Sequence, residues 1–569
     1  MRSPQQYALA VGRVCYQGEP VVAIAAQSRA LAEDAAERVG VEWEELPALA
    51  DEEVALKPGA PLLHPGYDSN LCYEQNSSTG DVASAFANAA AVVEATFRTG
   101  RHTHVTLEPR GVLAELNAGS GQLTVWHAGQ CPHMMQALIS HLFNISEAYV
   151  RVVVPDVGGS FGLKIQIFGD EMAAIALALT TKRPVKFVAD RLEAFQTDCH
   201  ARGHHIHARM AVNAAGDILG LSVDDVQSFG PFGSYPRVGI GEGRQVIGLA
   251  GGPYRNRNYS ARLRVVFQNK GIIGPYRAVG HPVACLITEA LMDRAARKLD
   301  IDPADIRRRN FIPEDAYPWK LNSGAVVETL SQQVALEKIL QRMNYAALRA
   351  EQAALRAKGT YRGIGLASFI EMTNPSSGIY GEAGAPIAAQ DACSVRLNAG
   401  GSLTCAVGVT DTGQGSSMVI NQIVASELGV AIDEVRVLLG DTDATPYGGG
   451  TWGSRATGIA GEAVLLASRA LRNNILEFAA LLLQSSADTL DIRGGQVCNR
   501  AEGTARISLR ELAELAYFKS GRLPKGYQPE LMVTRSFAQR DYPSIFSAPC
   551  KGAVSQWEPV PPGKGRSSR

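Results

Sequence analysis

The sequence predicts an α+β protein made of two related halves. Three observations support this class: predicted strands and helices alternate along the chain, glycine is frequent and clustered, and one order of motifs occurs twice. The chain has 569 residues, of which 46% are hydrophobic and 20% charged. These proportions are typical of a globular protein and exclude a disordered one.

Charge and cysteine content exclude several classes of function. The 55 Lys and Arg residues nearly balance the 56 Asp and Glu residues, so no excess charge attracts nucleic acid or an anionic membrane. The nine cysteines contain no CxxC pair, which excludes a zinc ribbon or a locally encoded iron–sulfur cluster. The N-terminus has no apolar signal core, and no apolar run is long enough to span a membrane. We therefore predict a cytoplasmic protein with reduced thiols.

The first 80 residues predict a strand–helix–strand unit. Residues 7–22 are strand-like, and 41–44 alternate as a strand would. Between them, residues 28–39 predict an amphipathic helix with Ser28 as N-cap and Gly40 as C-cap. A segment rich in Pro, Asn and Ser follows at 58–80, so we predict a first domain over 1–80.

Residues 81–325 mix predicted strands with predicted helices. A second boundary is expected near 315–335, where Pro313 and Pro318 occur, and residues 332–358 predict a long helical connector. The predicted domains are therefore 81–325 and 326–545, followed by a tail over 546–569. The strands are expected at 112–116, 121–127, 149–154, 206–212, 218–227, 261–267, 363–370 and 392–397, and the helices at 134–142, 170–179 and 285–299.

An internal repeat is the most informative feature. Each copy has a Gly-Gln pair, a helix, a strand carrying an arginine, and then a glycine loop. Gln130 precedes Arg151 by 21 residues, and Gln414 precedes Arg436 by 22. The glycine loops are 158–162 and 448–453. The same order and nearly equal spacing indicate a duplicated unit.

The repeat predicts a ligand held between the two copies. Helix N-termini and glycine-rich turns expose N–H groups that bind anionic or hydrogen-bonding ligands, and a glutamine amide adds donors and an acceptor. Two such sites facing each other would hold one large polar ligand. The alternative is that both loops are ordinary connections in a duplicated scaffold.

Two arginines extend this prediction. Arg277 lies in a Gly/Pro-rich segment before a helix, and Arg455 follows Gly453 and Ser454 at another helix start. A guanidinium there suits a phosphate or another anionic oxygen, although most arginines are simply exposed. The glycine loops match neither GxxxxGK[ST] nor GxGxxG, which disfavours an NAD or ATP enzyme.

The histidines do not predict a metal centre. His200, His204, His205 and His207 lack a carboxylate or cysteine at ligand spacing, and His205 and His207 would share a strand face away from His204. His102 and His104 are expected to be structural or to line a pocket.

Several of these motifs, in this order, resemble the molybdopterin-binding large subunits of the xanthine dehydrogenase, aldehyde oxidase and aerobic carbon monoxide dehydrogenase family, the molybdenum hydroxylases. The resemblance covers about residues 7–545. It is carried by Val157–Lys164, by the turn at 413–415, by Gly440–Asp443 with 450–455, by Tyr276-Arg277, and by the helix with Glu289 and the run 307–310.

The resemblance implies a fold, a cofactor and a reaction. The fold would be a partial α/β hammerhead domain followed by two related molybdopterin-binding domains. The cofactor would be molybdopterin with molybdenum, in its cytosine dinucleotide form, with no metal ligand from the protein itself. The reaction would be hydroxylation of an electron-poor carbon with oxygen from water. The cofactor-binding positions would be Gln130, Gly159, Phe161, Gly162, Arg277, Gln414, Gly453, Ser454 and Arg455.

Partner subunits follow from the same resemblance. The chain has no cysteine pattern for clusters and no flavin motif, so a small iron–sulfur subunit and a medium FAD subunit would carry the electrons. We expect a dimer of heterotrimers.

The departures from the family bear on activity and substrate. The family's catalytic glutamate would lie beyond the end of the chain, and Glu382 belongs to a different loop, so we expect a chain truncated at both ends. Ala278 replaces the cysteine of the carbon monoxide branch, Cys285 comes too late, and Ile165 replaces the carboxylate of the purine branch. An aldehyde or aromatic N-heterocycle is the expected substrate. The alternatives are a non-catalytic remnant that binds cofactor or partners, and a duplicated carbohydrate-binding or structural protein.

Overall fold

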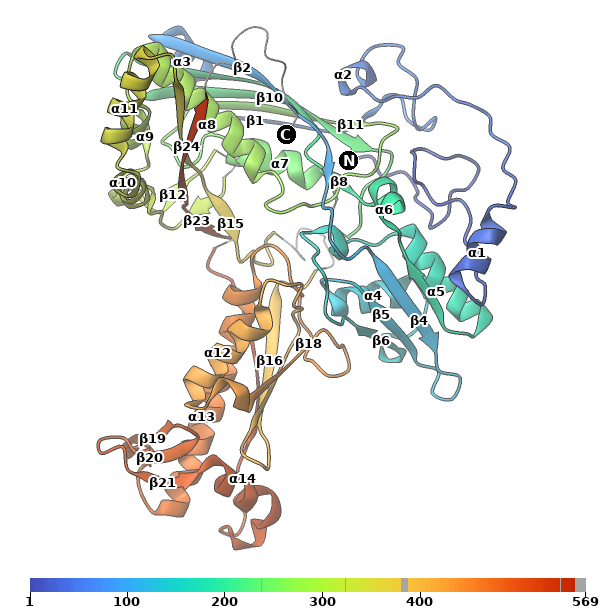
Figure 1. The fold of residues 1–569 in the computed structure, drawn as a ribbon, viewed down its shortest axis with the longest axis vertical. Coiled ribbons are helices and arrows are strands. Elements are labelled where there is room, and N and C mark those ends of the chain that lie inside the picture. The colour runs from blue at the N-terminus through green and yellow to red at the C-terminus, as the bar shows by residue number, and fades with distance from the viewer. Residues whose placement is uncertain (237, 323, 380–386, 543, 558–569) are drawn as a thin grey trace.

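The five-stranded sheet of the computed structural model joins strands from the beginning and the middle of the chain (Figure 1). The structure describes residues 1–236, 238–322, 324–379, 387–542 and 544–557. The strand order is β1-β11-β10-β9-β2, in which only β10 and β11 are parallel neighbours. These strands are β1 (Leu71–Thr79), β2 (Ala91–Thr99), β9 (His204–Val212), β10 (Ile218–Gly230) and β11 (Tyr259–Phe267).

Two helices, α7 (Ile240–Leu249) and α8 (His281–Leu299), lie across this sheet (Figure 1). Apolar residues of both helices, such as Val246 and Ile287, are buried together with inward residues of the sheet, such as Leu263. The helix α8 carries Pro282 in its first turn, where a missing N–H costs nothing. This core fixes both ends of the segment that contains Arg277.

A four-stranded sheet in the first half has the order β6-β5-β4-β7. The helix α4 (Pro132–Phe143) connects β5 to its parallel neighbour β6, and α5 (Gly169–Thr181) packs on the same sheet. Short helices lie at Glu147–Tyr149, Leu163–Ile165 and α6 (Arg191–Thr197). The strands are β4 (Gly111–Leu116), β5 (Leu123–His127), β6 (Val150–Val153) and β7 (Val185–Val188).

A second four-stranded sheet has the order β18-β17-β16-β22. The helix α12 (Ser416–Leu428) connects β17 to its parallel neighbour β18, and α13 (Gly461–Leu483) packs against the sheet. The strands are β16 (Gln390–Leu397), β17 (Leu403–Val407), β18 (Val435–Leu439) and β22 (Met532–Ala538). Since strand order and strand directions equal those of the first sheet, the predicted duplication is confirmed.

The remaining elements extend the two halves. β19 (Leu490–Arg493), β20 (Gln496–Asn499) and β21 (Ala505–Ser508) form a small sheet beside α14 (Leu509–Phe518), at the far end of the second half (Figure 1). The strand pairs β14 (Tyr361–Ser368) with β24 (Cys550–Trp557) and β15 (Glu371–Thr373) with β23 (Ile545–Ser547) lie near the first half. Further elements include α3 (Val82–Ala87), β3 (His102–Thr103), β8 (His200–Ala201), α9 (Pro303–Asn310), β12 (Trp319–Lys320) and β13 (Val326–Val327).

The N-terminal segment differs from its prediction. The strands predicted at 7–22 and 41–44 are wrong, because residues 1–70 contain only the helices α1 (Arg29–Ala36) and α2 (Glu52–Ala55). A strand needs a hydrogen-bonded neighbour, and the segment 7–22 has only two backbone hydrogen bonds of its own, from Ala10 N–H to the Pro20 carbonyl and from Glu19 N–H to the Tyr16 carbonyl. Ser28 is confirmed as an N-cap, but the C-cap of α1 is Glu37 rather than Gly40.

The helical connector is also interrupted. Residues 332–358 form two helices, α10 (Gln332–Met343) and α11 (Tyr345–Ala357), separated by Asn344 at a φ of +50°. Asparagine adopts this left-handed conformation more easily than most residues. The other predicted helices are present as α4, α5 and α8.

The predicted domain limits remain predictions, and the strand pairing adds detail to them. The limit at residue 80 follows β1, which pairs with β11, and the limit at residue 545 precedes β24, which pairs with β14. Residues 558–569 of the predicted tail, and Glu382, lie outside the described residues. No helix within the described ranges is both long enough and apolar enough to cross a membrane.

Candidate functional site

A cavity of about 900 Å³ opens between the two halves of the molecule. Its lining comes from the two glycine loops, the segment 275–281, the loop before α12, and the start of β15. The sequence predicted nine positions around a shared ligand, and all nine line this one cavity: Gln130, Gly159, Phe161, Gly162, Arg277, Gln414, Gly453, Ser454 and Arg455.

The first glycine loop, residues 158–162, is held by neighbours from elsewhere in the chain. Gly162 has a φ of +106°, and a Cβ atom there would lie 2.4 Å from the Pro275 carbonyl oxygen, so only glycine fits. The Gly158 amide donates to the Glu108 carboxylate, which also pairs with Lys164 at 2.7 Å. The Lys164 side chain is fully buried, and its burial lowers the pKa. These contacts fix the loop against the segment 104–108.

Gln130 connects the two halves. Its Oε1 accepts from the Gly162 amide at 3.2 Å, and its Nε2 donates to the Thr451 carbonyl at 2.7 Å. Its own carbonyl accepts from the Thr451 amide and from the Thr410 hydroxyl. The residue is 5% exposed, so its amide mainly joins the two glycine loops. Within the described residues, only one of the two Nε2 hydrogens has an acceptor, so the other can donate to a ligand.

Gln414 stabilises its own loop instead. Its Oε1 accepts from the Thr412 amide, and its Nε2 donates to the Thr410 carbonyl and the Ser416 hydroxyl. Beside it, Asp411 accepts from the amides of Gly413, Gly415 and Ser417. Burial alone would raise the pKa of Asp411, but these hydrogen bonds outweigh it and lower the pKa. The glutamine side chain is therefore preorganised at the cavity edge rather than free.

Arg455 differs from its prediction as an anion-binding side chain. Its guanidinium is fully buried and pairs with Asp391 at 2.9 Å, while donating to the carbonyls of Gly450 and Gln390. Burial raises the pKa of Asp391 to about 6, despite the adjacent arginine. The Arg455 amide donates to the Trp452 carbonyl, whereas the amides of Gly453 and Ser454 have no acceptor among the described residues. These two residues precede the short helix 456–460, which runs into α13.

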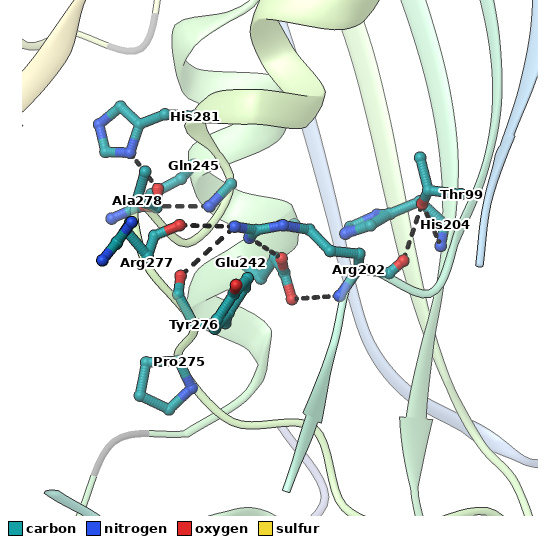
Figure 2. Close-up of polar contacts among 12 residues, drawn as sticks. Thr99, Arg202, His204, Glu242, Gln245, Pro275, Tyr276, Arg277, Ala278 and His281 are labelled. Atoms are coloured by element: carbon teal, nitrogen blue, oxygen red, sulfur yellow. Dashed lines mark hydrogen bonds and ion pairs between the residues drawn. The ribbon is translucent and has the colours of Figure 1, made fainter. Parts of the chain in front are cut away.

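Arg277 presents its side chain as predicted. The residue is exposed, its Cζ atom lies 4.7 Å from the centre of the Phe161 ring, and no described residue accepts a hydrogen bond from its guanidinium. Its backbone is held on both sides: its amide donates to the Phe161 carbonyl, and its carbonyl accepts from Arg202 (Figure 2). The stacked Phe161 and Arg277 pair therefore forms one wall of the cavity.

The segment 275–281 is supported from behind by buried side chains. His104 donates from Nε2 to the Pro275 carbonyl at 2.7 Å, and burial lowers its pKa to about 4, so it is neutral. Gln245 accepts from the Gly280 amide at 3.1 Å. His281 contacts the Ala278 carbonyl through Nδ1 (Figure 2). Its Nε2 accepts from the Met372 amide, which joins this segment to β15. His104, which was expected either to be structural or to line a pocket, is therefore structural.

The two duplicated sheets also meet directly. Arg151 forms a two-point ion pair with Asp441, at 3.0 and 2.6 Å, and the Val154 amide donates to the Gly440 carbonyl. The hydrogen bonds of Asp441 with Arg151 and Asp443 outweigh its burial and lower its pKa. This contact, at the strand ends, sets the distance between the two glycine loops.

Three positions bear on the expected substrate, namely Ala278, Ile165 and Cys285. Ala278 and Ile165 both line the cavity, whereas Cys285 does not and lies on α8. The remaining lining is partly apolar, from Val105, Leu107, Met372 and Ile379. Within the described ranges, no three His, Cys, Asp or Glu side chains gather to bind a metal ion; His204 pairs with Asp225 and His205 lies near Glu53.

Sequence reasoning missed several residues of the site. Asp411 could have been found, because Asp-Thr-Gly-Gln-Gly is typical of a turn that an aspartate carboxylate closes. Arg202, Glu242 and Asp391 had no such signal, since their partners are between 40 and 75 residues away.

Two family models match the chain. Both are described as a molybdopterin cofactor-binding domain, one over residues 63–311 and the other over residues 338–554. The nicotine 6-hydroxylase large subunit of Paenarthrobacter nicotinovorans is 32% identical over 530 residues, which cover 93% of this chain and 65% of that protein. The carbon monoxide dehydrogenase large chain of Hydrogenophaga pseudoflava is 33% identical over 553 residues, covering 92% of this chain and 67% of that one.

This chain is a member of the molybdenum hydroxylase family, among its molybdopterin-binding large subunits. The crystal structure of quinoline 2-oxidoreductase from Pseudomonas putida 86 superimposes with a TM-score of 0.89 at 29% identity, over 97% of this chain and 70% of that one. The chain thus spans about two thirds of the length of these relatives. The α+β fold with two related molybdopterin-binding domains is confirmed.

The cavity of this molybdenum hydroxylase subunit fits the cofactor of the family. Its volume of about 900 Å³ is within the range of small-molecule and cofactor sites. At Gly413, a Cβ atom would meet no atom within 4 Å, so a ligand can approach this backbone closely. The uncommitted guanidinium of Arg277 and the N–H groups at the start of the helix 456–460 are suitable donors for phosphate and pterin oxygens.

Proposed function

We propose that this chain binds molybdopterin, in its cytosine dinucleotide form, in the cavity between its halves, as the molybdenum-bearing part of an oxidoreductase. The proposal rests above all on the shared cavity, where both copies of the repeat meet around one space lined by donors. When bound, the cofactor supplies the redox-active metal for hydroxylation with oxygen from water. Arg277 and Ser454 would hold its anionic and polar groups.

We further propose an aldehyde or an aromatic N-heterocycle as substrate. The apolar side of the cavity, with Val105, Leu107 and Met372, suits a flat organic molecule and would exclude water around it. Two relatives are named for N-heterocycles, nicotine and quinoline. Ala278 offers no thiolate beside Arg277, which disfavours a site of the copper-bearing kind.

The proposed assembly follows the family. Electrons would pass to an iron–sulfur subunit and a FAD subunit, in a dimer of heterotrimers in the cytoplasm. Within the described residues, the nine cysteines are single thiols, and seven of them are buried. Within the part of the chain that the structure describes, no three of these thiols gather around one point, so we place the electron carriers on separate subunits.

Occupancy of the cavity is tested by filling it. Val419 lines the cavity from α12, and the adjacent Met418 is half exposed and does not. The chain is produced in a host that makes the cofactor, and molybdenum and pterin are measured per chain. We expect close to one of each in the unsubstituted protein, a strong loss in Val419→Trp, and no change in Met418→Trp. Folded protein that contains neither molybdenum nor pterin would overturn the proposal.

A further inference from the structure

Arg202 has an unusual backbone conformation between β8 and β9. Its φ is +71°, a region that residues other than glycine rarely adopt. The Thr99 hydroxyl donates to the Arg202 carbonyl at 2.7 Å and accepts from the His204 amide at 3.1 Å. The Glu242 carboxylate accepts from the Arg202 amide at 3.1 Å. Since three contacts maintain this strained conformation, the direction of the side chain is fixed as well.

The Arg202 side chain forms a buried ion pair and reaches the cavity loop. Its Nη1 lies 2.5 Å from Glu242 Oε1, and both side chains are buried. Its Nη2 donates to the Arg277 carbonyl at 2.6 Å and more weakly to the Tyr276 carbonyl at 3.4 Å (Figure 2). Burying the guanidinium without a carboxylate partner would cost free energy, so the Glu242 carboxylate stabilises it in its buried position behind the loop.

The orientation of one peptide group follows from this contact. The bond between Arg277 and Ala278 is trans, and in a trans peptide the carbonyl and the N–H point in opposite directions. The Arg277 carbonyl points to buried Arg202, so the Ala278 N–H points to the other side. Ala278 lines the cavity, and none of the described residues accepts a hydrogen bond from its amide.

Neighbouring contacts also prevent the peptide group between Arg277 and Ala278 from rotating. Ala278 and Val279 have φ values of +68° and +49°, which are strained for residues with a side chain. The Gly280 amide is bound by Gln245, and the Ala278 carbonyl accepts from the His281 amide. A charge-assisted bond at the Arg277 carbonyl also polarises the peptide, which makes its N–H a stronger donor.

We propose that Arg202 and Glu242 are positioning residues for the cavity. They fix the peptide between Arg277 and Ala278 with its N–H directed into the cavity, where it donates to an anionic oxygen of the bound ligand. The identity of that ligand as a molybdopterin cofactor rests on the proposed function. The fixed peptide orientation does not depend on it.

The test compares Arg202→Gln, Arg202→Lys and a matched control, Arg264→Gln. Arg264 pairs with Asp224 at 2.8 Å on the neighbouring strands but does not contact the loop. Amide hydrogen exchange is measured on the full chain without cofactor. In Arg202→Gln we expect exchange within 275–281 to accelerate at least about tenfold, because two bonds from a charged donor are lost. Arg202→Lys keeps a charged donor and should lose less protection, and Arg264→Gln should leave this segment unchanged.

Pterin retention is the second readout. After dialysis, Arg202→Gln should retain at least about threefold less pterin than the unsubstituted protein, and Arg264→Gln should retain as much. The proposal is overturned by unchanged exchange in 275–281, by equal acceleration across β9, β10 and β11, or by a loosened loop that keeps all its pterin. If the unsubstituted protein binds no pterin, the proposed function fails. The exchange data then decide on the positioning role alone, with local acceleration supporting it and uniform or absent acceleration rejecting it.

Discussion

The two glycine loops occupy equivalent places after the repeated strands β6 and β18, yet they are stabilised in different ways. The first loop relies on residues distant in sequence, namely Glu108, Gln130 and the Pro275 carbonyl. In the second half, Asp411 and Gln414 bind amides of their own turn, and the loop 448–453 is held by hydrogen bonds with Gln130 and by the buried ion pair of Asp391 with Arg455. Duplication therefore preserved the strand order and the position of the cavity, whereas the supporting contacts differ between the copies.

This difference predicts which substitutions lower the free energy of unfolding most in each half. Both loops are also held by neutral hydrogen bonds, but the ion pair beside the second loop is entirely buried, whereas the Glu108 carboxylate of the pair beside the first loop is 40% exposed. Loss of one partner from a buried pair leaves an uncompensated charge, which costs more than a lost neutral hydrogen bond. Substitutions in the two halves should therefore differ in size.

The largest effect is expected for Arg455→Met. Removing the guanidinium leaves the Asp391 carboxylate buried without its partner, which should lower the free energy of unfolding by about 3–5 kcal/mol. The control is Arg469→Gln, whose partner Glu427 lies 3.5 Å away at the surface and whose loss should cost about 0.5 kcal/mol or less. Chemical denaturation of both variants measures the difference. Equal effects would contradict the importance of the buried pair.

The two glutamines distinguish a contact between the halves from a contact within one loop. Gln130→Ala removes the partners of the Gly162 amide and the Thr451 carbonyl in a buried place and should cost about 2 kcal/mol. Gln414 is exposed, so Gln414→Ala should cost about 1 kcal/mol or less. The free energies of unfolding give the comparison. A larger loss in Gln414→Ala would show that the halves are not joined through Gln130.

The smallest effect concerns pH. The pKa of Asp391 is about 6 in the folded chain and near 3.8 when it is unfolded, so the folded state binds its proton more tightly. Raising the pH from 5 to 7.5 removes this proton from the folded state, and the stabilisation that it provided is lost, by about 1 kcal/mol. Asp391→Asn has no such proton and should lose correspondingly less stability over this range. Parallel pH profiles for the two proteins would contradict the raised pKa.

The sequence predicted the repeat from local patterns, and the resemblance that these motifs carry implied the nine cavity positions. Glycine loops, Gly-Gln turns and helix starts follow from neighbouring residues, and the duplicated order places them together. The failures involve long-range structure: residues 7–22 alternate like a strand but have no neighbouring strand, and Arg455 is directed by Asp391, a residue 64 positions away. Arg202 and Glu242 were missed for the same reason, since only the fold brings them to the loop at Arg277.

The central claim is that both copies of the repeat hold one ligand, and hydrogen exchange of the cofactor-loaded and cofactor-free protein tests it most directly. The segments to follow are 157–162 in the first half and 411–416 in the second, with β19–β21 as a remote reference. We expect both segments to gain protection together when the cofactor is bound, while the reference stays unchanged. Protection of one segment alone, with the other exchanging as in the cofactor-free chain, would contradict a site shared between the halves.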